Sequence, residues 1–201
     1  VVLSLKDPKV NKIGVYGLGG VGKTTLVQEI AKQVKHDKLF DVVVLVTISQ
    51  TKLERIQDEI AQQLGLDFEG RTLSSVRANH LCERIKNEDA ILIILDNLQE
   101  KIDLDELGIP SLDAWGKMNP ENVGVPLKDD YKGCKLLLTS RSKDILQKNH
   151  AQKNFLLDVL NGEEPWSLFE AMVGDVLKDD NFRKIAIQVA QRCVGLPVLI
   201  V

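Results

Sequence analysis

The stretch Gly17-Leu18-Gly19-Gly20-Val21-Gly22-Lys23-Thr24 decides the fold of this chain, because it fits the pattern G-x-x-x-x-G-K-[ST] of a phosphate-binding loop. Glycines adopt backbone conformations that a Cβ atom would forbid, so several N–H groups can point at one phosphate. A helix after the loop directs the positive end of its dipole at the same anion. In such a loop the Lys23 side chain reaches the β- and γ-phosphates, and the Thr24 hydroxyl ligates Mg²⁺.

The residues on either side of the loop supply the context that the motif requires. Residues 13–16 are a short apolar run, as a buried strand needs. After the loop, apolar residues recur at helical spacing from Leu26 to Val34. Strand, glycine loop and helix in this order favour a P-loop over a glycine-rich turn without a ligand. The predicted phosphate-binding residues are Gly17, Gly19, Gly20, Val21, Gly22, Lys23, Thr24 and Thr25.

The composition indicates an ordinary globular protein. The 201 residues are 44% hydrophobic and 27% charged, enough for one sizeable domain or for a domain with part of another. A net charge of −3 gives no basic surplus for nucleic acid. Apolar runs such as 90–95 are far shorter than the roughly 18 residues of a membrane span, and no secretory signal begins the chain. Cys82, Cys134 and Cys193 form no C-x-x-C pair, which favours free thiols. We expect a cytoplasmic protein.

Apolar runs alternate with helical patterns along the chain, which is typical of a parallel sheet with crossover helices. The run 42–46 is apolar on both faces, which predicts a strand in the middle of the sheet. Ser74 and Asn161 are candidate helix N-caps. Near residue 160 the pattern changes to helices alone, so we expect a P-loop nucleotide-binding domain over 1–158 and an incomplete helical subdomain over 159–201. Strands are expected at 12–16, 41–48, 90–95, 135–139 and 154–157. Helices are expected at 23–35, 53–64, 75–87, from Asn161 as the cap through 173, and over 182–193.

A P-loop site needs an acidic group beside Mg²⁺, in the form of an apolar strand that ends in Asp. The run 91–95 ends in Asp96, which we assign to the metal together with Thr24; the alternative is an Asp at an ordinary turn. Asn97 follows, where many ATP-hydrolysing relatives of this arrangement carry a second acid. A neutral amide takes no proton, although it can orient a water molecule. Glu100 is the other candidate base, so the catalytic residue is left unassigned.

The roles of two further sites, Arg141 and the stretch 195–197, depend on the residues that surround them. Arg141 follows the fourth expected strand, where an arginine can sense or stabilise the γ-phosphate; the alternative is a surface arginine at a helix start. Gly195-Leu196-Pro197, on its chemistry alone, is a C-cap glycine with a proline stop.

Several motifs, in this order, resemble the NB-ARC domain, the nucleotide switch of intracellular plant NLR disease-resistance proteins. The resemblance covers nearly the whole chain, and the sequences of the motifs are closer to the coiled-coil subclass than to the TIR subclass. Beyond the P-loop, the matching blocks are 40–50 (FDVVVLVTISQ), 93–96 (IILD), 133–141 (GCKLLLTSR), 155–158 (FLLD) with 164–169 (EPWSLF), and 193–197 (CVGLP).

The resemblance implies ADP in the resting state and ATP in the active one, both with Mg²⁺. It assigns phosphate and metal binding to Lys23 and Thr24, metal to Asp96, γ-phosphate sensing to Arg141 and adenine packing to Pro197. It also implies a longer parent protein with coiled-coil, winged-helix and leucine-rich-repeat regions, and possible self-assembly. The chain starts with Val1 and stops just after Gly-Leu-Pro, as expected for a fragment.

The sequence also departs from the family pattern. Asn97 stands where a second Asp is usual, and Gln99 stands where the coiled-coil subclass usually has Trp. Two other functions therefore stay open. One is an active ATPase or GTPase, although the N-K-x-D signature for guanine is missing and the D-x-x-G match at 113–116 is expected by chance. The other is a nucleotide-independent interaction module.

Overall fold

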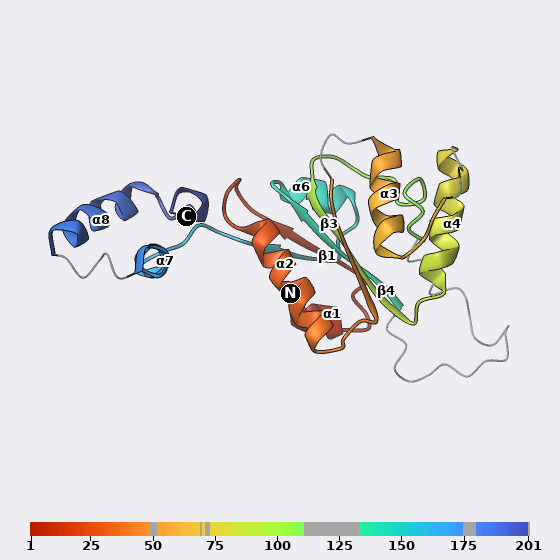
Figure 1. Ribbon diagram of the computed structural model, residues 1–201, viewed down its shortest axis with the longest axis horizontal. Coiled ribbons are helices and arrows are strands. Elements are labelled where there is room, and N and C mark those ends of the chain that lie inside the picture. Colours follow the sequence, from red (N-terminus) through yellow and green to blue (C-terminus); the bar gives the residue numbers. More distant parts are fainter. Residues whose placement is uncertain (49–51, 69, 71–72, 111–132, 175–179, 201) are drawn as a thin grey trace.

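The computed structural model describes residues 1–48, 52–68, 70, 73–110, 133–174 and 180–200. These residues form a sheet of five parallel strands in the order β2-β3-β4-β1-β5 (Figure 1). All five strands lie at the predicted places: β1 (Lys12–Tyr16), β2 (Val42–Thr47), β3 (Ala90–Leu98), β4 (Gly133–Ser140) and β5 (Lys153–Leu156). The helices are α1 (Val2–Lys6), α2 (Lys23–His36), α3 (Leu53–Gln63), α4 (Ser74–Lys86), α6 (Lys143–Lys148), α7 (Glu164–Val173), α8 (Asp180–Arg192) and the 3-10 helix η3 (Pro197–Leu199).

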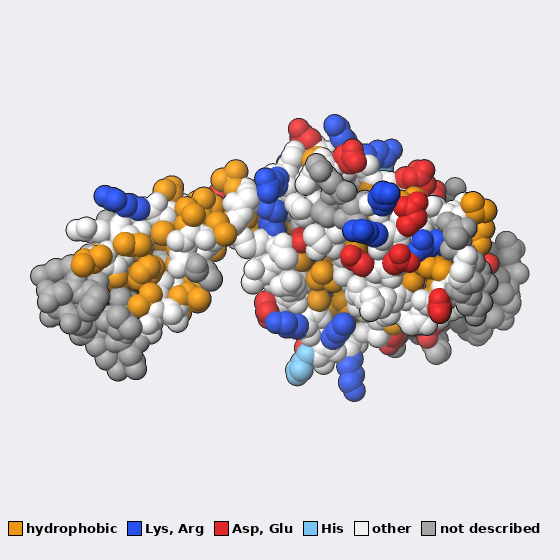
Figure 2. All heavy atoms as spheres, turned by 45° about the horizontal axis from the view of Figure 1, so that its top comes forward, with side chains coloured by type: hydrophobic (Ala, Val, Ile, Leu, Met, Phe, Trp, Pro, Cys, Tyr) orange, Lys and Arg blue, Asp and Glu red, His pale blue; other side chains and the backbone are white. Residues whose placement is uncertain are grey.

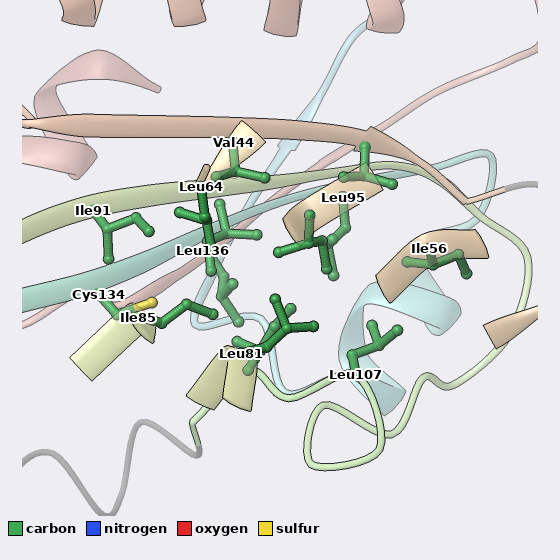
Figure 3. Close-up of a cluster of buried hydrophobic side chains, with 14 of the residues drawn as sticks. Val44, Ile56, Leu64, Leu81, Ile85, Ile91, Leu95, Leu107, Cys134 and Leu136 are labelled. Carbon is green, nitrogen blue, oxygen red and sulfur yellow. The ribbon is translucent and has the colours of Figure 1, made fainter. Parts of the chain in front are cut away.

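Hydrophobic side chains cover both faces of the sheet, because each strand alternates its side chains between two layers of helices. On one face, Ile91, Ile93 and Leu95 of β3 pack with α3, α4 and α6 (Figure 3). On the other face, Leu92 and Ile94 pack with α1 and α2. Figure 1 shows α1 and α2 on one side of the sheet and α3 and α4 on the other. The five side chains from Ile91 to Leu95 of β3 are fully buried, so the centre of the sheet is rigid and positions the loops at its edge.

The position of β2 corrects one prediction: β2 is an edge strand of the described sheet and not a central one. Both of its faces are covered, since Val44 packs in the layer of α3 and α4 and Val43 in the layer of α1 and α2. Its outer edge meets Gln63 of α3. The Gln63 side chain accepts a hydrogen bond from Leu45 N at 3.0 Å and donates one to Leu45 O at 2.9 Å. An apolar run therefore indicates two covered faces and says nothing of the strand's place in the sheet.

Strand β3 continues beyond its predicted end at Leu95. Its pairing with β4 shifts between Leu95 and Leu98, so two residues, Asp96 and Asn97, stand opposite the single residue Thr139. This arrangement is a β-bulge. Asn97 has a φ of 66°, in the left-handed region that asparagine tolerates better than most residues. The bulge places an irregular stretch of backbone directly at the carboxyl edge of the sheet.

Both predicted N-caps are wrong. Ser74 is the first residue of α4, and its hydroxyl donates a hydrogen bond to Glu54 Oε1 of α3 at 3.1 Å. Helix α7 begins at Glu164 and not at Asn161, whose side chain donates to Val159 O. The short helices α1 and α6 were not predicted, because five or six residues are too few for a periodic pattern. The D-x-x-G match at 113–116 lies outside the described residues.

Helices α7 and α8 lie apart from the sheet and follow β5 through a short connection (Figure 1). Figure 2 shows hydrophobic side chains gathered on this part of the molecule and charged side chains dispersed over the part that contains the sheet. Ala186, Ala190 and Cys193 are buried. The division at residue 158 stays a prediction. Exposed apolar residues of this part are Met172, Ile185, Ile187, Val189 and Val194.

The burial of Cys134 in β4 can be tested through the pH dependence of stability. Its side chain is 3% exposed, and burial raises the pKa of Cys134 from its ordinary value of 9.0 to about 12. As pH rises, the thiol ionises at a lower pH in the unfolded protein than in the folded one. Burial of the neutral Cys134 thiol therefore contributes fully to stability below about pH 9, and this contribution is lost between pH 9 and 12. From pH 9 to 10, the free energy of unfolding should fall by roughly 1 kcal/mol more in the wild type than in Cys134→Ala.

Urea unfolding curves of both proteins at the two pH values measure this difference. Cys82→Ala is the control, because it removes a thiol elsewhere and leaves Cys134 in place, so it should keep the pH dependence that Cys134 gives the wild type. Equal pH dependence in Cys134→Ala and the wild type would contradict the assignment.

Candidate functional site

The P-loop joins β1 to α2 at the carboxyl edge of the sheet, and α2 begins at Lys23 as predicted. Gly20 and Gly22 have φ values of 82° and 95°, which a Cβ atom disfavours. Gly17 requires glycine for another reason, since a Cβ there would lie 2.1 Å from Leu157 O. Because β1, β4 and β3 are neighbours, their carboxyl ends and the loop meet at one place.

The Lys23 side chain is held within its own loop. Its Nζ donates hydrogen bonds of 2.7 Å to Gly17 O and of 2.7 Å to Leu18 O, and the residue is 9% exposed. Burial and, second, the nearby Arg141 guanidinium lower the pKa of Lys23 from its ordinary value of 10.5, while the Asp96 carboxylate opposes this shift. The ammonium is thus a desolvated donor, which strengthens its attraction to an anion.

Asp96 is buried at the end of β3 and is held by two hydroxyl groups. The Thr24 hydroxyl donates to Oδ2 at 2.7 Å, and the Thr139 hydroxyl donates to Oδ1 at 2.5 Å. The backbone N–H of Asn97 donates to Thr139 Oγ1 at 2.8 Å. The predicted partners Thr24 and Asp96 are therefore in direct contact. Thr139 was missed as a site residue, because only the adjacency of β3 and β4 brings it to Asp96.

These residues surround one cavity of about 470 Å³. Arg141 lies over the loop, with its Cζ 3.5 Å from the position of a Cβ on Gly19. Of the predicted residues, Val21 is buried beneath the loop and Gly17 contributes the carbonyl that Lys23 contacts. The cavity is lined by Gly19, Gly20, Gly22, Lys23, Thr24, Thr25, Asp96, Asn97, Thr139, Arg141, Pro197 and Val198.

The two candidates for a base lie in different places. Asn97 lines the cavity beside Asp96. Glu100 lines a second cavity of about 380 Å³, between Ile48 after β2, helix α3 and the segment after β3. Asn149 fixes that segment, since its side chain donates to Glu100 O and accepts from Ile102 N. The structure therefore does not bring Glu100 to the P-loop.

The C-terminal segment returns to the P-loop after α8. Val198 N donates to Gly20 O at 3.2 Å, and Leu160 N donates to Gly195 O at 2.8 Å. Gly195 has a φ of 70°, and a Cβ there would lie 2.1 Å from Leu160 O. Pro197 starts η3 and lines the cavity. The Gly-Leu-Pro stretch thus closes one side of the site in addition to following the last helix.

The donor set around Asp96 fits a hard cation such as Mg²⁺. A carboxylate oxygen and a hydroxyl oxygen, from Asp96 and Thr24, face the same cavity. Mg²⁺ prefers oxygen ligands and is commonly held by one or two carboxylates together with phosphate oxygens. Within the described ranges, His, Cys, Asp and Glu side chains do not form a group of three that could hold a metal. The arrangement suits a cation that arrives with a phosphorylated ligand.

Comparison with known proteins connects this geometry to plant proteins. The family model described as NB-ARC domain matches residues 2–113 and 111–180. A probable disease resistance protein of Arabidopsis thaliana is 35% identical to the chain over 201 residues, covering 98% of the chain and 20% of that protein. The chain spans about a fifth of the length of such relatives.

Two solved structures share the fold. A Signal Transduction ATPase with Numerous Domains from Pyrococcus horikoshii has a TM-score of 0.51 at 17% identity, covering 99% of this chain and 28% of that one. AMPPCP-bound DnaA from Aquifex aeolicus has a TM-score of 0.50 at 15% identity, covering 99% and 57%. The predicted α/β P-loop NTPase fold is confirmed. Among the described residues, every helix is too short or too polar to cross a membrane.

Proposed function

Since this chain belongs to the NB-ARC domain family, we propose that it binds ADP and ATP with Mg²⁺ as the nucleotide switch of a plant disease-resistance protein. The observation that carries the proposal is the convergence of Lys23, Thr24, Asp96 and Arg141 on one cavity at the carboxyl edge of the sheet. These residues come from α2, β3 and the segment after β4. Phosphates bind at this edge in α/β folds.

The geometry supports distinct roles for the charged groups. Lys23 Nζ now donates to two carbonyls of its own loop, and phosphate oxygens in the cavity would offer it stronger, charge-assisted acceptors. Arg141 stands over Gly19 and lines the same cavity, so its guanidinium would sense the terminal phosphate of a bound nucleotide. Thr24 and Asp96 would hold Mg²⁺, which supplies charge neutralisation for the phosphates.

A switch fits this site better than rapid turnover. Asn97 lines the cavity where an acid would be needed, and an amide cannot accept a proton. Glu100, the other candidate, lines a different cavity. Binding without efficient hydrolysis allows a nucleotide to shift a conformational equilibrium, provided that it binds one state better than the other. Slow ATP hydrolysis is the alternative, and steady multiple-turnover phosphate release would favour it.

The setting of the whole protein is part of the same proposal. The plant relatives are about five times longer than this chain and are named disease resistance proteins. We infer that the nucleotide state is communicated to other regions of a parent chain in the cytoplasm: a coiled coil, a winged helix and leucine-rich repeats. Self-association on ATP binding would be the output. The coiled-coil subclass and the role of Pro197 beside adenine remain predictions.

Thermal unfolding with added nucleotide tests the proposal. With ligand at about 100 times its Kd, the folded state should gain roughly 2.7 kcal/mol. We expect an upward shift of the unfolding midpoint with Mg²⁺–ADP and Mg²⁺–ATP, and little shift with Mg²⁺–GTP. An equal or larger shift with GTP would contradict adenine specificity. An unfolding midpoint that none of the three nucleotides shifts would favour a nucleotide-independent interaction module.

A further inference from the structure

The Thr139 side chain is buried and forms hydrogen bonds with both residues of the β3 bulge. Its hydroxyl donates to Asp96 Oδ1 at 2.5 Å and accepts from Asn97 N at 2.8 Å. A hydroxyl has a single proton, so donation to the carboxylate fixes its orientation and leaves its lone pairs for the N–H. Thr139 is fully buried, which shields both hydrogen bonds from competition with water.

The bulge explains why a hydroxyl is needed at this position. Asp96 and Asn97 together stand opposite Thr139, so the regular ladder between β3 and β4 is interrupted there. A buried backbone N–H without a partner is costly. The Thr139 side chain supplies the acceptor for Asn97 N in place of a β4 carbonyl, and this stabilises the left-handed backbone of Asn97.

The same hydroxyl determines how the carboxylate of Asp96 is turned. Oδ1 accepts a hydrogen bond from Thr139 of β4, and Oδ2 accepts one from Thr24 of α2. Thr24 is exposed to the cavity. Without the Thr139 donor, Oδ1 would be buried without this partner, and the carboxylate could rotate away from Thr24. Groups that orient a metal ligand typically affect metal affinity 10- to 100-fold when removed.

We propose that Thr139 is a positioning residue of the Mg²⁺–nucleotide site: it aims the Asp96 carboxylate at the cavity and fixes the backbone of Asn97 beside it. This inference rests on the proposed function. It predicts that Thr139 controls the part of nucleotide affinity that depends on Mg²⁺ and leaves the P-loop contacts unchanged.

Calorimetric titration of ADP in Mg²⁺ and in EDTA tests this inference. Thr139→Val keeps the shape but removes the hydroxyl, and it should reduce the gain in affinity from Mg²⁺ by about 10- to 100-fold while affinity in EDTA changes little. Thr139→Ser should restore the gain. Ser140→Ala is the matched control, since the neighbouring buried hydroxyl also donates a hydrogen bond to β3, but its acceptor is Leu98 O and not Asp96. It should keep the wild-type ratio.

An unchanged Mg²⁺ ratio in Thr139→Val, or an equal loss in Ser140→Ala, would overturn the inference. If Thr139→Val fails to fold, Thr139→Val in an Asp96→Asn background removes the unpaired carboxylate. That double variant should gain as much affinity from Mg²⁺ as Asp96→Asn alone, because both lack the carboxylate that Thr139 orients. A smaller gain in the double variant would overturn the inference. A wild-type chain that binds ADP under neither condition overturns the proposed function itself, and the inference with it.

Discussion

Replacing Lys23 with methionine should weaken ADP binding by about tenfold or more. Methionine keeps much of the aliphatic stem and removes the ammonium, whose contacts with charged groups are worth roughly 1.5–3 kcal/mol each. Every 1.4 kcal/mol corresponds to a factor of about ten in Kd. The effect is expected in EDTA as well as in Mg²⁺, because the contact is made to phosphate and not through the metal. Titration calorimetry with ADP under both conditions measures it.

Lys135 is the matched control for Lys23. It is also a buried lysine whose Nζ donates to two backbone carbonyls, here Asp7 O at 2.6 Å and Val10 O at 2.8 Å. It lies near the start of β4, at the end of the sheet away from the P-loop. Lys135→Met should lower the unfolding midpoint yet leave the Kd for ADP unchanged. If both variants lost affinity equally, the loss would reflect general destabilisation, and the role of Lys23 would be refuted.

Replacing Gly195 with alanine should destabilise the protein strongly. Its φ of 70° disfavours a side chain, and the added Cβ would lie 2.1 Å from Leu160 O and 3.2 Å from Leu160 N. Both contacts are to backbone, so no change of rotamer relieves them. The hydrogen bond from Leu160 N to Gly195 O should be displaced too. Urea unfolding measures the free energy lost, and ADP titration shows whether the displaced segment also affects the site.

Gly65→Ala separates the strain of the left-handed backbone from the steric overlap with Leu160. Gly65 has a similar φ of 65° after the end of α3, and a Cβ there would meet nothing within 4 Å. In Gly65→Ala the free energy of unfolding should fall only by the strain of the left-handed backbone, about 1–2 kcal/mol. Gly195→Ala should cost about 1–3 kcal/mol more, the usual range for overpacking. Equal costs would show that the connection near Leu160 moves aside easily.

The parts of the fold that could be predicted are those with local signals. The P-loop is a continuous motif, and its start of α2 at Lys23 is confirmed. The sequence pattern identified the five strands within two residues at most of their ends, apart from the extension of β3. For β3 and β4 the signal is a long apolar run, because both faces of these strands are buried. Asp96 could be placed beside Thr24 because parallel strands present their carboxyl ends at the same edge, and the 2.7 Å hydrogen bond agrees with this.

The parts that could not be predicted depend on contacts between distant segments. Val43 and Val44 are equally apolar whether β2 is central or at the edge, so only the strand order places it. The bulge at Asn97 appears only when β3 is paired with β4. Thr139 is one more polar residue at a strand end until that pairing brings its hydroxyl to Asp96. The exclusion of Glu100 likewise needed the path of the chain after β3.

Gln63 has a consequence for how copies of this protein behave toward one another. The free edge of a sheet offers unpaired N–H and C=O groups to any passing strand, and this is a common route to aggregation. The Gln63 amide occupies both groups of Leu45, in the middle of the outer edge of β2. A side chain from the protein's own helix thus satisfies these two backbone groups of the edge strand, so they are not available to pair with the strand of a second chain.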